Sequence, residues 1–416
     1  MKRIILLLLI SIILIQCSKG VDDQVLNEEQ GTETFLFSIN VIGNLFKETT
    51  TGHLYLSDAN GDIIVDGALI NNQETYLSAV FDINDVYDVT LIYKVLTVGQ
   101  TYYLTSTYED VNPNTYNINE IKRLNPNQDR INLDLSNTGF PLEVISHSGS
   151  YISDGNPDNG GTFNFDSLLP ASPGDYYAAF KSPDDNLPRY FWMENVNGNT
   201  NLNIDFTSLP FVNTSITTQF PTNESLSVNV HGFKNDDNNN IHHLVHFKGY
   251  QNGSNSDITL VPDNLFDYYA FHSNFNINNT TYYYSKKSQD IIQNISLPNF
   301  DLTINTNSIN NFSMNTSGNY DVFNVIYSLS NIDDNVFVFY YIYGKSSSVV
   351  TFSKSNLFNQ IFSEIPEVSI DDLLFDSARI ESYSNINNYD NYLIHLIDFY
   401  STIKDDYILE RVSKSE

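Results

Sequence analysis

Short runs of alternating apolar and polar residues recur along this chain from about residue 33 to its end. The runs are rich in β-branched and aromatic residues, and Asn, Asp, Gly and Pro separate them, which is typical of strands joined by turns. Residues 53–57 and 63–65 form one such pair, and Asn60-Gly61 between them supplies the positive φ of a tight hairpin. No long amphipathic helix is predicted. The pattern therefore predicts an all-β protein.

The chain also resembles itself at an offset of 92 residues, which is the distance from Asp175 to Asp267. Residues 167–178 recur at 259–270, and a further shift of the same size lays 264–266 on 356–358. Toward the N-terminus the match is looser: it places 78–87 on 167–176, 102–103 on 190–191 and 131–135 on 202–206. Repeats of this length predict tandem modules, each about the size of a seven-stranded sandwich.

Four tandem β-sandwich modules are therefore expected, with boundaries at residues 33–140, 141–225, 226–310 and 311–416. In the second module the strand 161–165 is followed by Leu169 and by Pro173-Gly174-Asp175-Tyr176. These residues resemble the strand and Pro-Gly turn of prealbumin-like or carboxypeptidase-regulatory-like sandwiches. An immunoglobulin-like sandwich has the same size. Both types of module remain open.

The first residues of the chain indicate export and lipid anchoring. Lys2 and Arg3 precede an apolar run, 4–15, that is shorter than the roughly 20 residues of a membrane span and is typical of a signal peptide, here 1–16. Leu14-Ile15-Gln16-Cys17 resembles the lipobox of bacterial lipoproteins, although Gln16 replaces the usual small residue. The resemblance implies a diacylglyceryl group on Cys17, which would hold the protein on a membrane. A buried free thiol is the alternative.

Residues 17–32 are polar and predict a lipidated, acidic tether. The segment Ser18-Lys19-Gly20-Val21-Asp22-Asp23 resembles the signal that exports some lipoproteins to the outer face of the bacterial outer membrane. A flexible linker is the other interpretation. We therefore expect a lipid-anchored protein of the outer membrane that faces the cell exterior.

Charge narrows the range of partners. Lys and Arg number 20 against 50 Asp and Glu, which gives a formal net charge of -30. A nucleic acid is excluded as a partner because no basic cluster is available to bind phosphates. Cys17 is the single cysteine, so the fold depends on apolar burial and has no disulfide.

Aromatic residues are the main candidates for ligand binding. Tyr190 and the single tryptophan, Trp192, would share one face of a strand, with Phe191 on the other face. If Phe191 packs inward, the pair could stack on sugar rings, and Tyr282 and Tyr284 would repeat the platform in the next module. The alternative buries Trp192 in the core.

Two acidic turns have the pattern Asp-x-Asn-x-Asp, which suits calcium. The bidentate acid of an EF-hand is missing, because Leu69 and Phe165 occupy the twelfth positions. Hairpin turns use the same residues for backbone reasons. The weak calcium candidates are Asp58, Asn60, Asp62, Asp154, Asn156 and Asp158.

Other chemistry is not predicted. His242 and His246 would lie about 13 Å apart on one strand, too far to bind one ion. No nucleophile elbow, zinc helix or phosphate-binding loop is found, so no cofactor is expected.

The sequence favours a non-enzymatic surface protein for adhesion, docking or assembly with a protein or glycan. One alternative is a glycan-capture accessory lipoprotein, similar in layout to those of outer-membrane uptake systems. The other is a hydrolase with an unrecognised pair of carboxylates.

Overall fold

A computed structural model describes residues 33–81, 86–119, 129–139, 141–148, 152–153, 157–158, 161–169, 173–234, 243–386, 388–397 and 408–415. The predicted signal peptide, Cys17 and the whole of the predicted tether lie outside the described residues. The chain divides into two compact units, residues 1–34 with 80–85 and residues 35–79 with 86–416. Apart from residues 33–34 of β1 and 80–81 of β4, the features below belong to the second unit.

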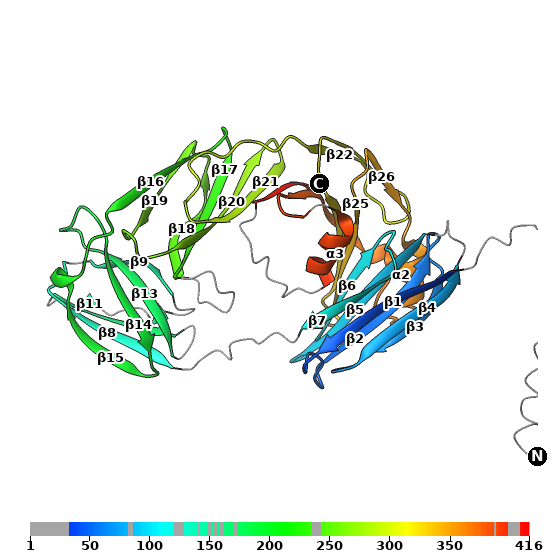
Figure 1. The fold of residues 1–416 in the computed structure, drawn as a ribbon, viewed down its shortest axis with the longest axis horizontal. Helices are drawn as coiled ribbons and strands as arrows, with labels where there is room; N and C mark the ends of the chain where they lie inside the picture. The colour runs from blue at the N-terminus through cyan, green and yellow to red at the C-terminus, as the bar shows by residue number, and fades with distance from the viewer. Residues whose placement is uncertain are drawn as a thin grey trace, which may run out of the picture. The chain divides into compact units, whose positions relative to one another are not determined.

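The described chain is an all-β protein, which confirms the predicted fold class (Figure 1). Alternating patterns explain the strands: in Arg130–Ser136, for example, Ile131, Leu133 and Leu135 are buried and the residues between them are not. Two short α-helices are described, α2 (Ser355–Ile361) and α3 (Tyr389–Ile397). Among the described residues, no helix is long and apolar enough to cross a membrane.

Chain order and strand pairing together group the strands into four sandwiches. Sandwich 1 contains β1 (Glu33–Ile42), β2 (Thr50–Asp58), β3 (Ile63–Leu69), β4 (Glu74–Phe81), β5 (Tyr87–Thr97), β6 (Gln100–Tyr108) and β7 (Asn114–Asn119). Sandwich 2 contains β8 (Arg130–Ser136), β9 (Glu143–His147), β10 (Ile152–Ser153), β11 (Pro157–Asp158), β12 (Thr162–Leu168), β13 (Gly174–Lys181), β14 (Arg189–Val196) and β15 (Thr200–Asp205), followed by the 3-10 helix η1 (Phe206–Ser208).

Sandwich 3 contains β16 (Thr214–Gln219), β17 (Ser225–Phe233), β18 (His243–Asn252), β19 (Ser256–Val261), β20 (Tyr268–Ile277) and β21 (Thr280–Ser288). Sandwich 4 contains β22 (Asp301–Thr306), β23 (Phe312–Ser317), β24 (Val322–Asn331), β25 (Val336–Lys345), β26 (Val349–Phe352), β27 (Leu374–Tyr383) and β28 (Ile408–Lys414), together with α2, the 3-10 helix η2 (Ile370–Asp372) and α3.

One strand order recurs in these sandwiches. One sheet is β4-β1-β7 in sandwich 1, β12-β8-β15 in sandwich 2 and β19-β16 in sandwich 3, and the first strand runs parallel to the last segment of its sandwich. The opposite sheets are β3-β2-β5-β6, β9-β13-β14 and β18-β17-β20-β21. In an immunoglobulin domain the first two strands share a sheet. Here they lie in different sheets, so the immunoglobulin order is not the one found.

The sheets β3-β2-β5-β6 of sandwich 1 and β18-β17-β20-β21 of sandwich 3 are each joined edge to edge to one sheet of sandwich 4. Sandwich 4 contributes β28-β27-β24-β25, and the full order of the twelve-stranded sheet is β18-β17-β20-β21-β28-β27-β24-β25-β6-β5-β2-β3. Sandwich 3 joins sandwich 4 through antiparallel β21 and β28, and sandwich 4 joins sandwich 1 through parallel β25 and β6. The last sandwich of the chain is thus paired with the first.

The pairing groups the strands differently from the predicted module boundaries. The boundaries at residues 141, 226 and 311 each come after the first strand of the next sandwich, which is β8, β16 or β22. The alignment of 131–135 with 202–206 explains the first difference. Those segments are β8 and β15, which are parallel neighbours within sandwich 2, with Leu133 opposite Leu202.

Candidate functional site

Tyr190 and Trp192 lie where sandwich 2 meets sandwich 3. Phe191 is 8% exposed in the core of sandwich 2, as the stacking hypothesis required, so Tyr190 and Trp192 point away from that core. Sandwich 3 covers this outer face. The Trp192 ring makes edge contacts with His243 at 5.0 Å and with Phe266 at 5.8 Å between centroids, and its Nε1 donates to Glu194 Oε1 at 3.4 Å. Trp192 is therefore a half-buried residue of a junction.

Tyr282 and Tyr284 do not repeat that arrangement. Tyr284 is buried in the core of sandwich 3, where its ring lies 6.5 Å from that of Phe271. Tyr282 is half-buried, stacks on Phe275 at 5.4 Å, and packs at the join between sandwiches 3 and 4. The structure does not bring the four predicted stacking residues together, and protein groups already contact their rings.

The first calcium candidate is a turn that anchors α2. Asp58 Oδ1 accepts the main-chain N–H groups of Asn60 and Asp62, both at 2.9 Å. Asp62 Oδ1 accepts amide N–H groups from Asn356 at 2.8 Å and Gln360 at 3.3 Å. Amide donors around this oxygen favour the hairpin and its contact with α2 over a cation.

The second calcium candidate is largely outside the described residues. Asp154 and Asn156 are not described, and Asp158 is described only as part of β11. Within the described part of the chain, no group of three or more His, Cys, Asp or Glu side chains is placed to hold a metal ion.

The predicted histidine strand is β18, with His242 outside the described residues. His243 is 1% exposed, and its Nδ1 lies 2.6 Å from Ser148 Oγ of sandwich 2. His246 Nε2 lies 2.7 Å from Asp257 Oδ2, which joins the two sheets of sandwich 3. Burial alone would raise the pKa of Asp257, but the hydrogen bond and charge of His246, together with Lys248, lower it. The two described histidines therefore hold sandwiches and sheets together.

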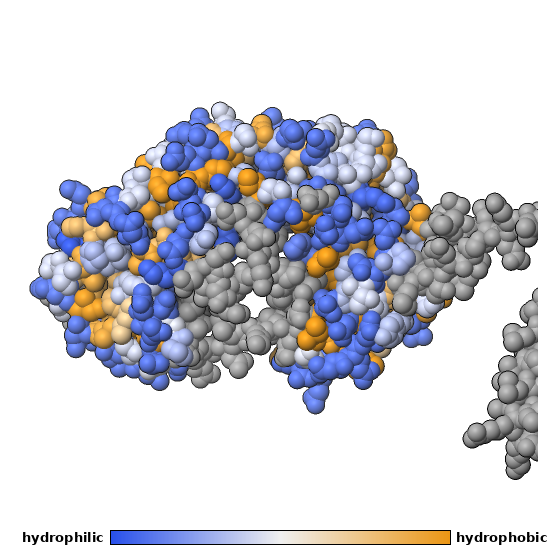
Figure 2. Space-filling model, in the orientation of Figure 1, coloured by the Kyte–Doolittle hydropathy of each residue, from blue (hydrophilic) through white to orange (hydrophobic). Residues whose placement is uncertain are grey.

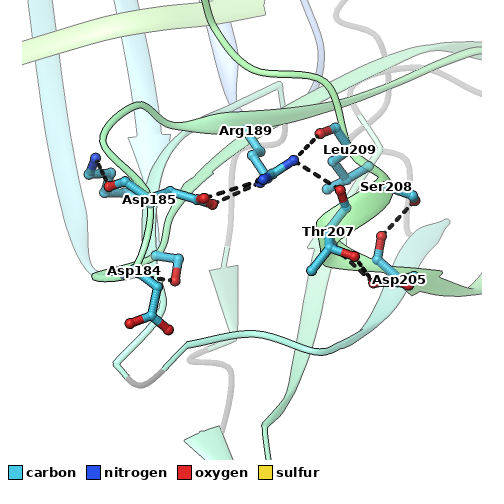
Figure 3. Close-up of polar contacts among 9 residues, drawn as sticks. Asp184, Asp185, Arg189, Asp205, Thr207, Ser208 and Leu209 are labelled. Atoms are coloured by element: carbon cyan, nitrogen blue, oxygen red, sulfur yellow. Dashed lines mark hydrogen bonds and ion pairs between the residues drawn. The ribbon is translucent and has the colours of Figure 1, made fainter.

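An arginine cluster that the sequence analysis missed closes one end of sandwich 2 (Figure 3). Arg189 Nε and Nη2 donate to the two carboxylate oxygens of Asp185 at 2.7 and 3.2 Å, while Nη1 donates to the carbonyls of Thr207 and Leu209 on the other side. The Phe211 ring covers the guanidinium at 3.8 Å. All these contacts are internal, so the cluster fixes two loops. The i, i+4 spacing of Asp185 and Arg189 was its one visible signal.

A second missed cluster holds sandwich 4 on sandwich 1. Lys354, just before α2, places Nζ 2.6 Å from Asp88 Oδ2 and 2.8 Å from Glu109 Oε1. Burial raises the pKa of Glu109 to about 7 even though Lys354 acts to lower it. Burial would lower the pKa of Lys354, but Glu109 and Asp88 raise it, so the lysine stays charged. Two of the three partners come from sandwich 1, and no local sequence pattern links them to Lys354.

Helix α3 also makes contacts within sandwich 4 and with sandwich 1. Glu381 of β27 accepts from Tyr392 of α3 at 2.6 Å and from Arg411 of β28 at 2.5 Å. Asp390 of α3 accepts the amide of Asn112, which belongs to sandwich 1, at 3.0 Å. Sandwich 4 therefore holds sandwich 1 through α3 as well as through α2.

Two small open hollows lie in sandwich 4, and both are lined in large part by polar residues. One of about 350 Å³ lies beside β22 and the end of β28, and is lined by Thr303, Ile304, Asn305, Thr306, Asn307, Lys414 and Ser415. Another of about 320 Å³ is lined by Thr316, Ser317, Gly318, Asn319, Tyr320, Ser346, Ser347 and Ser348. Hydroxyl and amide groups contribute much of both linings, which suits a small polar ligand.

No protein-family model matches this chain, and no curated protein matches it. The geometry of its own residues is therefore the basis for a functional argument.

Proposed function

We propose that this chain is a lipid-anchored protein of the bacterial outer membrane that binds or assembles with a partner outside the cell and performs no catalysis. The anchor would be the diacylglyceryl group implied at Cys17, and the tether after it would give the sandwiches reach.

The observation that carries the binding part of this proposal is the twelve-stranded sheet that runs through three sandwiches. Ladder hydrogen bonds at β21–β28 and β25–β6 replace the flexible linkers usual between domains. The buried Lys354 cluster and the helices α2 and α3 reinforce the second join. A rigid body of this kind presents surfaces at fixed spacing, which favours adhesion or assembly.

A glycan ligand is the second candidate, and the two polar hollows of sandwich 4 favour it. Their threonine, serine and asparagine side chains offer hydrogen bonds to sugar hydroxyls. The half-buried Trp192 at the junction gives the hypothesis less support than the sequence suggested, because His243 and Phe266 contact its ring.

The anchor is tested by growing producing cells with labelled palmitate. The expected result is label on the wild-type chain and none on Cys17→Ala, and an unlabelled wild type would contradict the proposal.

Protease added to intact cells should digest the chain if it faces outward, whereas protection would place it inside the outer membrane. Pull-down with purified protein, run beside a glycan array, distinguishes a protein partner from a sugar.

A further inference from the structure

Exposed aliphatic side chains gather at one end of the twelve-stranded sheet, where two hairpin tips are neighbours. Strands β6 and β25 run parallel from their first residues, and the N–H of Thr101 donates to the carbonyl of Asn335 at 2.9 Å. Ser328, near the end of β24, faces Leu374 at the start of β27. The turns β5–β6 and β24–β25 and the start of β27 therefore lie at the same end. The exposed residues there are Val98 and Ile332 in the turns and Leu104 and Leu374 on one face of the sheet, whereas Leu96, opposite Thr101, points to the other face.

These side chains lie next to a closely packed pair of strands, β6 and β25. Tyr102 of β6 and Phe337 of β25 face each other across the parallel pair, and their rings stack at 5.0 Å with 16° between planes. Val98 at one tip is fully exposed, while Ile332 at the other is 74% exposed and Leu374 is 67% exposed. Figure 2 shows that hydrophilic residues cover much of the face in view. Single exposed aliphatic residues are ordinary, but a group of them indicates an interaction site.

Carboxylates surround the aliphatic group on its sandwich 4 side. Asp333 and Asp334 follow Ile332 in the turn, Asp371 and Asp372 of η2 precede Leu374, and Asp376 follows it. Glu367 belongs to the same rim because its carbonyl accepts the Asn331 amide at 3.3 Å. All six acidic residues are exposed. The nearby Lys94 lies over the Tyr103 ring at 5.6 Å. We call the exposed aliphatic residues and the six acidic residues around them the hairpin-tip surface.

We infer that the hairpin-tip surface docks a basic protein segment that carries apolar side chains. This inference names the partner for the proposed binding function and rests on that function. The negative charge of the hairpin-tip surface indicates which partner it can bind. A second copy of the chain has the same net charge of -30 and is repelled, as are anionic lipid headgroups. A neutral glycan would gain nothing from six carboxylates, whereas Lys and Arg beside apolar residues would match both parts of the surface.

The test uses the purified full chain and a fluorescent peptide of alternating Leu and Lys, with a Leu and Glu peptide as the matched ligand control. The Leu and Lys peptide should bind, and more weakly as salt is added. The double variant Val98→Asp, Ile332→Asp should lower its affinity about tenfold or more. The triple variant Asp333→Asn, Asp371→Asn, Asp372→Asn should also lower the affinity and should flatten its salt dependence.

Two control variants separate this surface from the general negative charge of the chain. Ile258→Asp changes an exposed aliphatic residue of β19, and Asp290→Asn with Glu143→Gln and Asp267→Asn removes three exposed acids of sandwiches 2 and 3. Both should bind the peptide like the wild type, and hydrogen exchange should slow at residues 96–104 and 331–336 when peptide is bound. Equal losses in the control variants would overturn the inference.

Binding of the Leu and Glu peptide through the same residues would also overturn it. So would vesicles of phosphatidylcholine and phosphatidylglycerol that bind the wild type but not the Val98, Ile332 variant, or self-association abolished by that variant. None of these results bears on Cys17, because the palmitate and protease experiments measure anchoring separately.

Discussion

Lys354 and Asp88 form a buried ion pair although 266 residues separate them in the chain. Nζ lies 2.6 Å from Oδ2, and both side chains are only 4% exposed. The pair joins the sandwich that ends the chain to the sandwich that begins the described fold, so it tests whether that join is part of the folded protein.

Replacing Lys354 with Met should lower the free energy of unfolding by about 3–5 kcal/mol, because Asp88 and Glu109 would stay buried without a cation. Methionine retains most of the apolar stem. Urea unfolding followed by circular dichroism measures the loss. Lys345→Met is the matched control: that lysine pairs with Asp110 but is 54% exposed, so its removal should cost about 1 kcal/mol or less. Similar losses in the two variants would argue against the buried cluster.

The join should also depend on pH through Glu109, whose pKa is raised by burial to about 7 from an ordinary value of 4.5. A raised pKa means that the folded state holds the proton more tightly than the unfolded state. The contribution to stability is thus complete below about pH 4.5 and is lost as pH rises through about 7. Lys354 adds nothing to this change, because its raised pKa keeps it charged throughout.

Glu109→Gln should remove that part of the pH dependence. The difference in unfolding free energy between wild type and variant, measured by urea titration at several pH values, should move in favour of the variant as pH rises from about 5 to 8. The exposed Glu143→Gln serves as the control and should give a constant difference. A constant difference for Glu109→Gln as well would show that the carboxyl titrates normally.

Alternation along single strands was enough to predict the fold class, because burial of every second residue is a local property. Joins between sandwiches are not local. Thr105 and Tyr340 lie opposite each other in the parallel pair β6–β25, yet each fits an ordinary strand on its own. The same limit affected β8, whose alternating pattern matches that of β15 because the two are neighbours in one sheet.

Trp192 shows the limit for the candidate site. The sequence correctly placed Phe191 and Trp192 on opposite faces, but it allowed only a solvent-exposed or a core position for the tryptophan. The third possibility, a face covered by the next sandwich, depends on Phe266 and His243, which lie more than 50 residues further along the chain. Lys354 and its two carboxylates were missed for the same reason.

Trp192→Ala should therefore destabilise the protein, by about 2–3 kcal/mol, rather than act only on ligand binding. The value lies below that of a fully buried tryptophan because Trp192 is half-buried at the junction with Phe266. Circular dichroism during urea unfolding measures the change. Phe247→Ala, at a 60% exposed ring of β18, is the control and should cost much less. An unchanged stability in Trp192→Ala, with loss of glycan binding, would restore the stacking hypothesis.

The Asp62 turn distinguishes a structural contact from a calcium site. Asp62 Oδ1 accepts amide hydrogens from Asn356 and Gln360, so Asp62→Ala should free the start of α2 and lower the unfolding free energy by about 1 kcal/mol. Hydrogen exchange in residues 355–361 should quicken, while Glu48→Ala, in the loop before β2 and at the other end of that strand from Asp62, should leave it unchanged. A calcium site would behave differently: calcium would raise the melting temperature of the wild type and a chelator would lower it. Because amide donors already occupy the oxygen, we expect neither shift in calorimetry.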